Sequence, residues 1–315
     1  MKNDDDYRPL VSIIICVYNG QRYVRTAIES ILSQSYPNIE LIIINDGSTD
    51  SSPQIINEFK ERAIVVNQEN IGQPASLNKG WSLARGEIVG YLSDDDFFHS
   101  NAIKELVLAM SDESIDICYP NFDLIDPNSK VIREIVSRRF CYSKLIRHID
   151  NPIGPGVLFR KKIFENFGGW REDLIQMPDL AYWLKVTKFC NVQWVNKNLA
   201  AFRVHNNSQT FEGVSKARAD EVISIIDTTY NDLDLSEYNE YLNESKSNAL
   251  FISGQLHLRA GRYIIGISRF YRGSLLFWKN SFSMKTYRML INGLINRKLH
   301  SFLWSAKKFL EMGSK

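Results

Sequence analysis

Residues 87–99 have the sequence Glu-Ile-Val-Gly-Tyr-Leu-Ser-Asp-Asp-Asp-Phe-Phe-His, an apolar run that leads into three acidic residues. Its apolar part, Ile88–Leu92, is typical of a short buried strand. Three consecutive aspartates, Asp94, Asp95 and Asp96, follow at the strand's end. Adjacent like charges beside apolar neighbours are unfavourable, and a divalent cation such as Mg²⁺ or Mn²⁺ would stabilise them. A solvated acidic turn explains the triplet alone equally well.

Similar apolar runs recur on both sides of this segment and alternate with helical patterns. Such alternation at short intervals predicts an α/β fold, a Rossmann-like sheet of mostly parallel strands flanked by helices. The expected strands are Val11–Val17, Ile39–Ile44, Ala63–Val66, Ile88–Leu92 and Ile115–Tyr119, with helices expected near residues 22–33, 51–60, 74–86 and 102–110.

Polar segments follow three of these strands at their carboxyl ends. They are Tyr18-Asn19-Gly20, Asp46-Gly47-Ser48 and the aspartate triplet. In open α/β sheets, ligands bind at the carboxyl ends of the strands, so the three segments are expected to meet at one edge. The glycine fingerprint of dinucleotide-binding enzymes is missing after the first strand, and so is a P-loop. A dehydrogenase or a Walker-type nucleotide hydrolase is therefore disfavoured.

The composition predicts a folded protein of the cytoplasm. The chain has 315 residues, 44% hydrophobic and 23% charged. No apolar run is long enough for a membrane-spanning helix, and the start has no signal-peptide core. The four cysteines, Cys16, Cys118, Cys141 and Cys190, lack metal-ligand spacing and are expected to be reduced.

The C-terminal third differs from the rest in pattern and charge. Helical periods dominate after Ser215, so we expect a tail at 1–8, an α/β domain at 9–212 and a helical region at 213–315. From Gly254 to Lys315 there are twelve Lys or Arg and one acid, Glu311, a net +11 that leaves 2 − 11 = −9 elsewhere. Interleaved aromatics make an anionic membrane surface a candidate partner, whereas no nucleic-acid motif accompanies the charge.

Six motifs between Pro9 and Thr210 together resemble the family-2 glycosyltransferases, inverting enzymes with the nucleotide-sugar-binding GT-A fold. In order they are Val-Ser-Ile-Ile-Ile-Cys-Val-Tyr-Asn-Gly, Ile-Asn-Asp-Gly-Ser-Thr-Asp, Asn-Ile-Gly with Leu-Asn-Lys-Gly, Ala-Arg-Gly-Glu-Ile-Val-Gly-Tyr-Leu-Ser-Asp-Asp-Asp, Phe-Gly-Gly-Trp, and Pro-Asp-Leu-Ala-Tyr-Trp-Leu-Lys. Each motif is weak alone, but six in consistent order are specific.

The resemblance implies a role for each matching residue. Asp179 would be the catalytic base, and Asp95, Asp96 and His205 would lie at the metal. The nucleotide pocket would comprise Val17, Tyr18, Asn19, Asp46, Gly72, Asn78 and Asp94. Among these, Asp46 would bind the base and Asp94 the ribose.

Two positions depart from the family pattern. Ser93 stands where the common Asp-x-Asp motif has its first aspartate, so the register of the metal motif among Asp94, Asp95 and Asp96 stays open. Pro178 replaces an acidic residue before the base, which removes a supporting interaction.

Considered without the resemblance, several of these residues have plain structural explanations. Asp46 then fits a turn that caps the next helix, and Asp179 a carboxylate at a helix start. His205 is better explained as a structural histidine.

The resemblance implies an inverting, metal-dependent transfer of a hexose or N-acetylhexosamine in cell-surface polysaccharide or glycolipid synthesis. The expected donor is a nucleotide-diphosphate sugar, first of all a UDP-sugar, and the expected acceptor is a glycan or lipid-linked hydroxyl. Mn²⁺ or Mg²⁺ would be the cofactor. The expected location is cytoplasmic, with peripheral binding at the inner membrane face. A sugar-phosphate nucleotidyltransferase and a non-catalytic nucleotide- or glycan-binding scaffold remain alternatives.

Overall fold

The computed structural model describes residues 8–205 and 214–294. Most of the predicted tail, the predicted boundary near residue 212 and the basic stretch after residue 294 lie outside this part. The described chain forms two compact units, one of residues 8–142 and 151–205, the other of residues 143–150 and 214–294.

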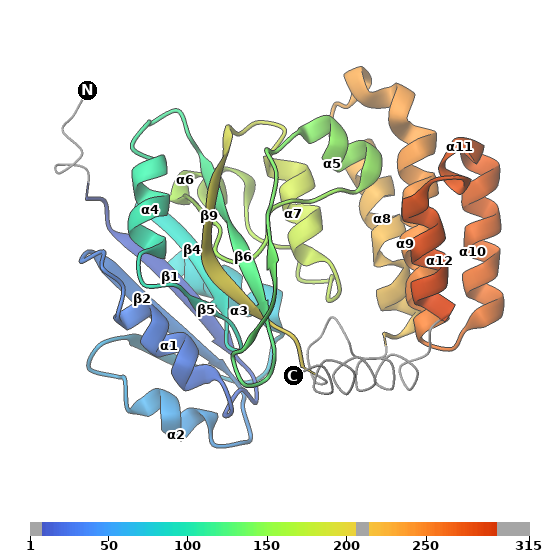
Figure 1. Cartoon of the computed structure of the whole chain (residues 1–315). Coiled ribbons are helices and arrows are strands. Elements are labelled where there is room, and N and C mark those ends of the chain that lie inside the picture. The colour runs from blue at the N-terminus through green and yellow to red at the C-terminus, as the bar shows by residue number, and fades with distance from the viewer. Residues whose placement is uncertain (1–7, 206–213, 295–315) are drawn as a thin grey trace, which may run out of the picture. The chain divides into compact units, whose positions relative to one another are not determined.

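The first unit contains a mixed sheet, in which the described residues form nine strands in the order β3-β2-β1-β4-β8-β6-β9-β5, with β7 beside β6 (Figure 1). Strands β1 to β4 are parallel where they pair, and so are β6 and β9. The remaining pairs are antiparallel. The bounds are β1 Val11–Val17, β2 Ile39–Asp46, β3 Ile64–Gln68, β4 Ile88–Ser93, β5 Phe97–Phe98, β6 Ile117–Ile125, β7 Val131–Ile135, β8 Leu158–Arg160 and β9 Val192–Arg203.

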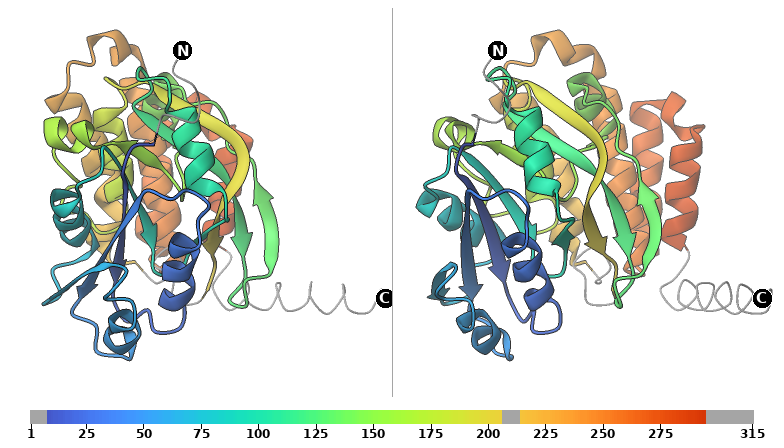
Figure 2. Two further views of the ribbon diagram at one scale, coloured as in Figure 1. Left: turned by 90° about the vertical axis from the view of Figure 1, so that its left-hand side faces the viewer. Right: turned by 60° about the vertical axis from the view of Figure 1, so that its left-hand side comes forward.

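Helices cover both faces of this sheet, which explains why β1 is apolar at nearly every position. Its odd-numbered residues pack with α1 (Val24–Leu32) and α4 (Ala102–Ala109), on the same side of the sheet (Figure 2). Helix α3 (Gln73–Leu83) lies against Ile14 on the other face. The remaining helices of the unit are α2 (Ser52–Asn57), α6 (Lys161–Phe167) and α7 (Pro178–Val186). The expected α/β class with a mostly parallel first half is confirmed.

Helices α2 and α3 end earlier than predicted. Helix α2, expected near residues 51–60, ends at Asn57. The expectation was a stop at Gly86, but α3 ends at Leu83. The residues beyond it bind the sheet instead, because the Arg85 amide donates to Glu40 at 2.8 Å and the Gly86 amide to Ser12 at 2.9 Å. These bonds satisfy a polar pair inside the sheet, which sequence periodicity does not show.

The second unit is helical, as predicted. Helix α9 (Leu242–Arg259) contacts α8 (Lys216–Asp232), α10 (Tyr263–Leu276) and α12 (Met284–Leu294). It also includes the 3₁₀ helix η1 (Ser236–Tyr241), α11 (Trp278–Ser281) and most of α5 (Tyr142–His148). Within the described residues, no helix combines the length and apolar character needed to cross a membrane.

Candidate active site

The ends of β1 and β2 are joined by Asn19, as the sequence predicted for this edge. Its amide N–H donates to Ser48 Oγ at 3.1 Å, and its Oδ1 accepts from the Thr49 amide at 2.8 Å. Asn19 has φ 56°, a left-handed conformation that asparagine tolerates better than most residues. Tyr18 beside it is 55% exposed. The Val17 side chain is fully buried in the core, so only its backbone faces this edge.

Asp46, at the end of β2, organises the following loop. Its Oδ1 accepts from the Ile71 amide at 2.9 Å, and its Oδ2 from the Gly72 amide at 3.0 Å. Gln68 Nε2 donates to the same carboxylate at 2.9 Å. A carboxylate has about four acceptor positions, so capacity remains for a nucleobase. Asp46 and Gly72 therefore lie together, and their place in a nucleotide pocket stays a prediction.

Asp94 lies directly against the turn after β1. A Cβ atom on Gly20 would be 2.2 Å from Asp94 Oδ2, so the close approach needs glycine. Burial raises the pKa of Asp94 to about 8, and the charge of Asp95 adds to the rise, although a hydrogen bond from the Tyr18 backbone opposes it. The predicted nucleotide residues at positions 18, 19 and 94 are thus adjacent.

Asp95 and His205 form a close pair although 110 positions separate them in sequence. His205 Nε2 lies 2.9 Å from Asp95 Oδ2. The His205 ring also packs on Tyr23, with 5.1 Å between ring centroids. Carboxylate and imidazole are both common metal ligands. Two of the three side chains that the resemblance assigns to the metal therefore face each other.

Asp96 is held by Arg203, a residue that the sequence analysis missed. Arg203 is 1% exposed, and its backbone N–H donates to Asp96 Oδ1 at 2.8 Å. Its Nε donates to the Asp95 carbonyl at 2.7 Å, and its Nη1 to Ser129 Oγ at 2.9 Å. The guanidinium carbon lies 4.4 Å from the Tyr23 ring centroid. In the sequence, Arg203 stood out only as a positively charged residue at the end of an apolar strand, two residues before His205.

Asp179 lies in the first turn of α7. Pro178 begins this helix, a position where proline's missing N–H costs nothing. Burial raises the pKa of Asp179 above its ordinary value, although backbone hydrogen bonds at the helix start oppose the shift. Burial and the nearby charge of Asp179 together raise the pKa of the Tyr91 phenol.

Asp96 and Asp179 line the same pocket, which has a volume of about 310 Å³. They are the acidic groups of a mainly apolar wall. The other lining residues are Tyr91, Leu92, Ser93, Phe122, Leu124, Ile153, Gly154, Pro155 and Phe202. Asp96 of the triplet and the predicted base therefore share one cavity, and the apolar lining was not predicted.

An aromatic cluster behind the pocket positions α7. Trp81 on α3 stacks on Tyr182 of α7 at 6.2 Å and contacts Trp170 edge-on at 5.8 Å. Asn78, one turn earlier on α3, donates to the Trp170 carbonyl and accepts from its amide, both at 2.8 Å. The amide of Asn78 is thus used to fix the Trp170 loop, while its predicted place in the nucleotide pocket stays a prediction.

The donor set fits a divalent cation that shares its ligands with a substrate. Among the residues that the structure describes, no three His, Cys, Asp or Glu side chains form a metal-binding group by themselves. Asp95 and His205 supply two adjacent ligands, and Mg²⁺ and Mn²⁺ commonly complete their shell with substrate phosphates and water. Which aspartates bind the metal stays a prediction.

Comparison with known proteins gives a family match. The family model described as Glycosyl transferase family 2 matches residues 12–168, about half of the chain. An uncharacterised glycosyltransferase of Rickettsia typhi is 28% identical over 319 residues, which cover 96% of this chain and 93% of that protein.

Solved structures share the fold. S. aureus TarS (residues 1–349), solved with UDP-GlcNAc, has a TM-score of 0.65 at 16% identity and covers 87% of this chain and 93% of its own. Mannosyltransferase PcManGT from Pyrobaculum calidifontis, solved with GDP-Man and Mn²⁺, has a TM-score of 0.61 at 16% identity, with 94% and 84% covered.

Fold and family match together define a nucleotide-sugar-dependent glycosyltransferase with a GT-A fold. The chain belongs to glycosyl transferase family 2. The nucleotidyltransferase and scaffold alternatives are not supported by these matches.

Proposed function

We propose that the protein transfers a hexose or N-acetylhexosamine from a UDP-sugar to a hydroxyl of a glycan or lipid-linked acceptor, with inversion and with a divalent metal, in cell-surface polysaccharide or glycolipid synthesis. The observation that carries the proposal is the pocket shared by Asp96 and Asp179. It supports a site where the sugar donor, bound at residues 94–96 (the aspartate loop), meets the acceptor hydroxyl beside α7.

Asp179 is the general base of the proposed reaction. Inverting transfer is an in-line displacement, so the acceptor hydroxyl must lose its proton as it attacks the anomeric carbon. The carboxylate of Asp179 accepts that proton. Its raised pKa makes it a stronger base than an exposed aspartate, and the largely apolar pocket limits competing water.

The donor is bound at the edge formed by the strand ends. Asp46 and the Gly72 backbone face the nucleobase, and Asp94 with Asn19 faces the ribose. When bound at Asp95 and His205, a divalent cation would neutralise the charge that develops on the diphosphate leaving group. Asp96 keeps the loop in register through its bond with Arg203.

A thermal-shift experiment tests the proposal. Full-length protein is heated with UDP, GDP or dTDP, each with Mn²⁺ or with EDTA. We expect UDP to raise Tm with Mn²⁺ and to lose most of this effect in EDTA, since a ligand that binds only the folded state stabilises it. Asp95→Asn should lose the metal-dependent part, and Asp179→Asn should keep it. No stabilisation by any nucleotide with Mn²⁺ would contradict the proposal, and stabilisation by GDP or dTDP alone would contradict the choice of UDP.

We also propose that the second unit binds an anionic membrane, at the inner face of the cytoplasmic membrane. The outer face of α10 and the α11–α12 segment is apolar, with Ile264 87% and Phe282 82% exposed. The same helices carry three exposed basic residues, Arg272, Lys279 and Lys285. Residues 254–294 contain no Asp or Glu. This charge would repel a second copy and attract acidic lipid.

Vesicle sedimentation tests the membrane proposal. We expect pelleting with phosphatidylglycerol vesicles, release at high salt, and little pelleting with phosphatidylcholine alone. The double variant Ile264→Ser, Phe282→Ser should bind more weakly. Failure to pellet with phosphatidylglycerol, or self-association that buries this face, would overturn the proposal.

A further inference from the structure

The candidate pocket has one wall made of apolar side chains, and every residue that lines the pocket belongs to the first unit. Phe122 and Leu124 on β6 lie in this wall beside Phe202 on β9. Leu124 pairs with Phe202 across the two strands, and side chains alternate between the faces of a sheet, so the three side chains share one face. By the same alternation, the polar Asn121 and Asp123 lie on the other face of β6. We call Phe122, Leu124 and Phe202 the apolar wall.

The apolar wall is held in place from two sides. Phe122 and Phe202 meet edge-on, with 6.5 Å between their ring centroids. A Cβ atom on Gly154 would lie 2.8 Å from the Phe122 ring, so the loop of residues 151–156 packs closely on that ring. Within the loop, the Ile153 amide donates to Asn151 Oδ1 at 3.1 Å. A preformed wall needs little ordering when a ligand binds, which favours affinity.

The polar side of the pocket is small. It consists of the Asp96 and Asp179 carboxylates with the lining residues Ser93 and Tyr91. Burial and the charges of Asp179 and Asp96 together raise the pKa of the Tyr91 phenol, and the Tyr91 ring packs edge-on against Trp170 at 5.0 Å. A wholly apolar ligand, such as a lipid chain, would leave these polar groups facing carbon, which is unfavourable. The pocket therefore suits a ligand that has both hydroxyl groups and an apolar face.

The pocket offers no positive charge to such a ligand. Among the described residues that line it, none is Lys, Arg or His. Arg203 reaches Asp96 through its backbone, but its guanidinium donates to the Asp95 carbonyl and to Ser129, and Arg203 is not part of the lining. A carboxylate or phosphate bound here would meet two acidic side chains without a compensating cation, which is costly. The ligand of this pocket is therefore uncharged where it is bound.

The charged part of the sugar donor has a separate place. Asp95 and His205, which the proposed function assigns to the metal and the diphosphate, do not line the pocket. With a volume of about 310 Å³, the pocket is at the lower end of the range for ligand sites. Its size suits a single sugar residue better than an extended chain.

We propose that the pocket binds the terminal sugar of the acceptor as a neutral hexopyranose, with a C–H face of the ring on Phe122 and Phe202 and the attacking hydroxyl directed to Asp179. A pyranose has C–H groups on its faces and hydroxyl groups around its rim, which matches one apolar wall and a few polar groups. Phe122 and Phe202 are then specificity-determining residues, and uronic acids and sugar phosphates are poor acceptors. That the bound sugar is the acceptor rests on the proposed function, whereas the preference for a neutral ring does not.

Saturation-transfer NMR on the full-length protein tests the proposal without a donor. The probes are the methyl glycosides of glucose, galactose, mannose and N-acetylglucosamine, each uncharged, and the methyl glycosides of glucuronic and galacturonic acid. We expect at least one neutral glycoside to bind, with the strongest saturation on C–H protons of one ring face. Its uronic acid counterpart should bind at least about tenfold more weakly. Absence of binding by all four neutral glycosides, or equal affinity for the uronic acids, would overturn the inference.

Three variants test the two sides of the pocket. Phe202→Leu keeps the wall apolar but removes a ring, so the neutral glycoside should bind about threefold to tenfold more weakly, the worth of one aromatic contact. The control Phe189→Leu changes an aromatic side chain of the same unit that is 56% exposed and stacks on Phe167, and it should bind as the wild type does. Asp179→Asn removes one negative charge, so the discrimination against uronic acids should shrink. Unchanged discrimination in Asp179→Asn, or equal effects of the two Phe variants, would contradict the assigned contacts.

Competition with nucleotides separates this inference from the proposed function. UDP with Mn²⁺ should leave the neutral glycoside bound, because the donor's charged part lies outside the pocket. Displacement by UDP-glucose with Mn²⁺, but not by UDP with Mn²⁺, would show that the pocket holds the donor sugar and would overturn the assignment to the acceptor. If the wild type binds the glycoside but no UDP, the UDP-dependent function fails while the neutral sugar site stands.

Discussion

At the scale of single residues, the carboxylates of the site differ in what surrounds their charge. Asp46 accepts hydrogen bonds from backbone amides, and Asp95 faces His205. Asp96 accepts a hydrogen bond from the backbone N–H of the buried Arg203. Asp179 stands at a helix start inside a mainly apolar pocket. These surroundings suit different tasks, three of holding a loop or ligand and one of accepting a proton.

The pH dependence of the reaction should follow Asp179. Only the ionised carboxylate can act as base, and its pKa is raised above the ordinary 3.8 by burial. As pH falls through the raised pKa, kcat/KM should therefore fall, with the acidic limb lying above the range of an exposed aspartate. A pH profile of kcat/KM measures this. Asp173→Asn, which changes an exposed carboxylate paired with Arg171, should leave the limb unchanged. A value of kcat/KM that does not change with pH in the acidic range would contradict the assignment.

Arg203 should matter for stability as well as for the site. Arg203→Met leaves the Asp95 carbonyl and Ser129 without this charged donor, so the free energy of unfolding should fall by about 3 kcal/mol, the upper value for a hydrogen bond to a charged group. Urea denaturation measures the change. The control Arg171→Met, at an exposed pair, should lower it by no more than about 0.5 kcal/mol. Equal losses of unfolding free energy in both variants would show that the buried contacts of Arg203 stabilise the fold no more than the exposed pair of Arg171 does.

At the scale of elements, α9 and α10 pack through glycines. A Cβ atom on Gly266 would lie 2.6 Å from the Leu258 side chain and 3.0 Å from the Gly254 carbonyl oxygen. The backbone oxygen cannot move without shifting α9. Close helix packing in the second unit therefore depends on the absence of side chains at these positions.

Gly266→Ala should therefore destabilise the protein despite the higher helix propensity of alanine. Propensity favours alanine by about 1 kcal/mol, but overpacking costs about 1 to 3 kcal/mol, so we expect a net loss of about 1 kcal/mol. Thermal unfolding measures it. On the same helix, exposed Ser268→Ala should be neutral or slightly stabilising. A Gly266→Ala protein as stable as the wild type would rule out tight packing here.

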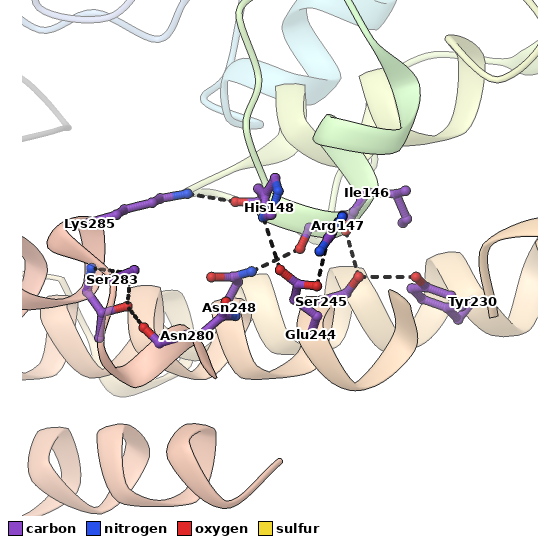
Figure 3. A network of polar contacts seen from close by, with 11 residues as sticks. Ile146, Arg147, His148, Tyr230, Glu244, Ser245, Asn248, Asn280, Ser283 and Lys285 are labelled. Atoms are coloured by element: carbon purple, nitrogen blue, oxygen red, sulfur yellow. Dashed lines mark hydrogen bonds and ion pairs between the residues drawn. The ribbon is translucent and has the colours of Figure 1, made fainter. Parts of the chain in front are cut away.

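The elements also show how far the sequence could predict the structure. The strands from Val11 to Leu92 were predicted because apolar runs and turn signals are local features. The early end of α3 was not, because it depends on Ser12 and Glu40, distant in sequence. The place of α5 in the second unit was not predicted either, since Glu244, which binds Arg147 (Figure 3), gives no local signal.

At the scale of the whole molecule, the sequence predicted where the polar side chains of the candidate site lie better than it predicted the apolar ones. The meeting of the strand ends followed from the topology of α/β sheets, and Asp94 and Asn19 do lie at one edge. The apolar wall was missed because Phe122 and Ile153 resemble ordinary core residues in sequence. The pairing of β6 with β7 and β9 and the course of the 151–156 loop bring them to the pocket.

The aspartate loop binds the donor in this account, and Asp179 on α7 accepts the proton of the acceptor. Measuring turnover and UDP–Mn²⁺ affinity on Asp179→Asn and on the wild type tests this separation of roles directly. We expect turnover to fall by about a hundredfold to ten-thousandfold, the usual contribution of a general base, with the affinity unchanged. An Asp179→Asn enzyme with turnover within about threefold of the wild type would contradict the claim.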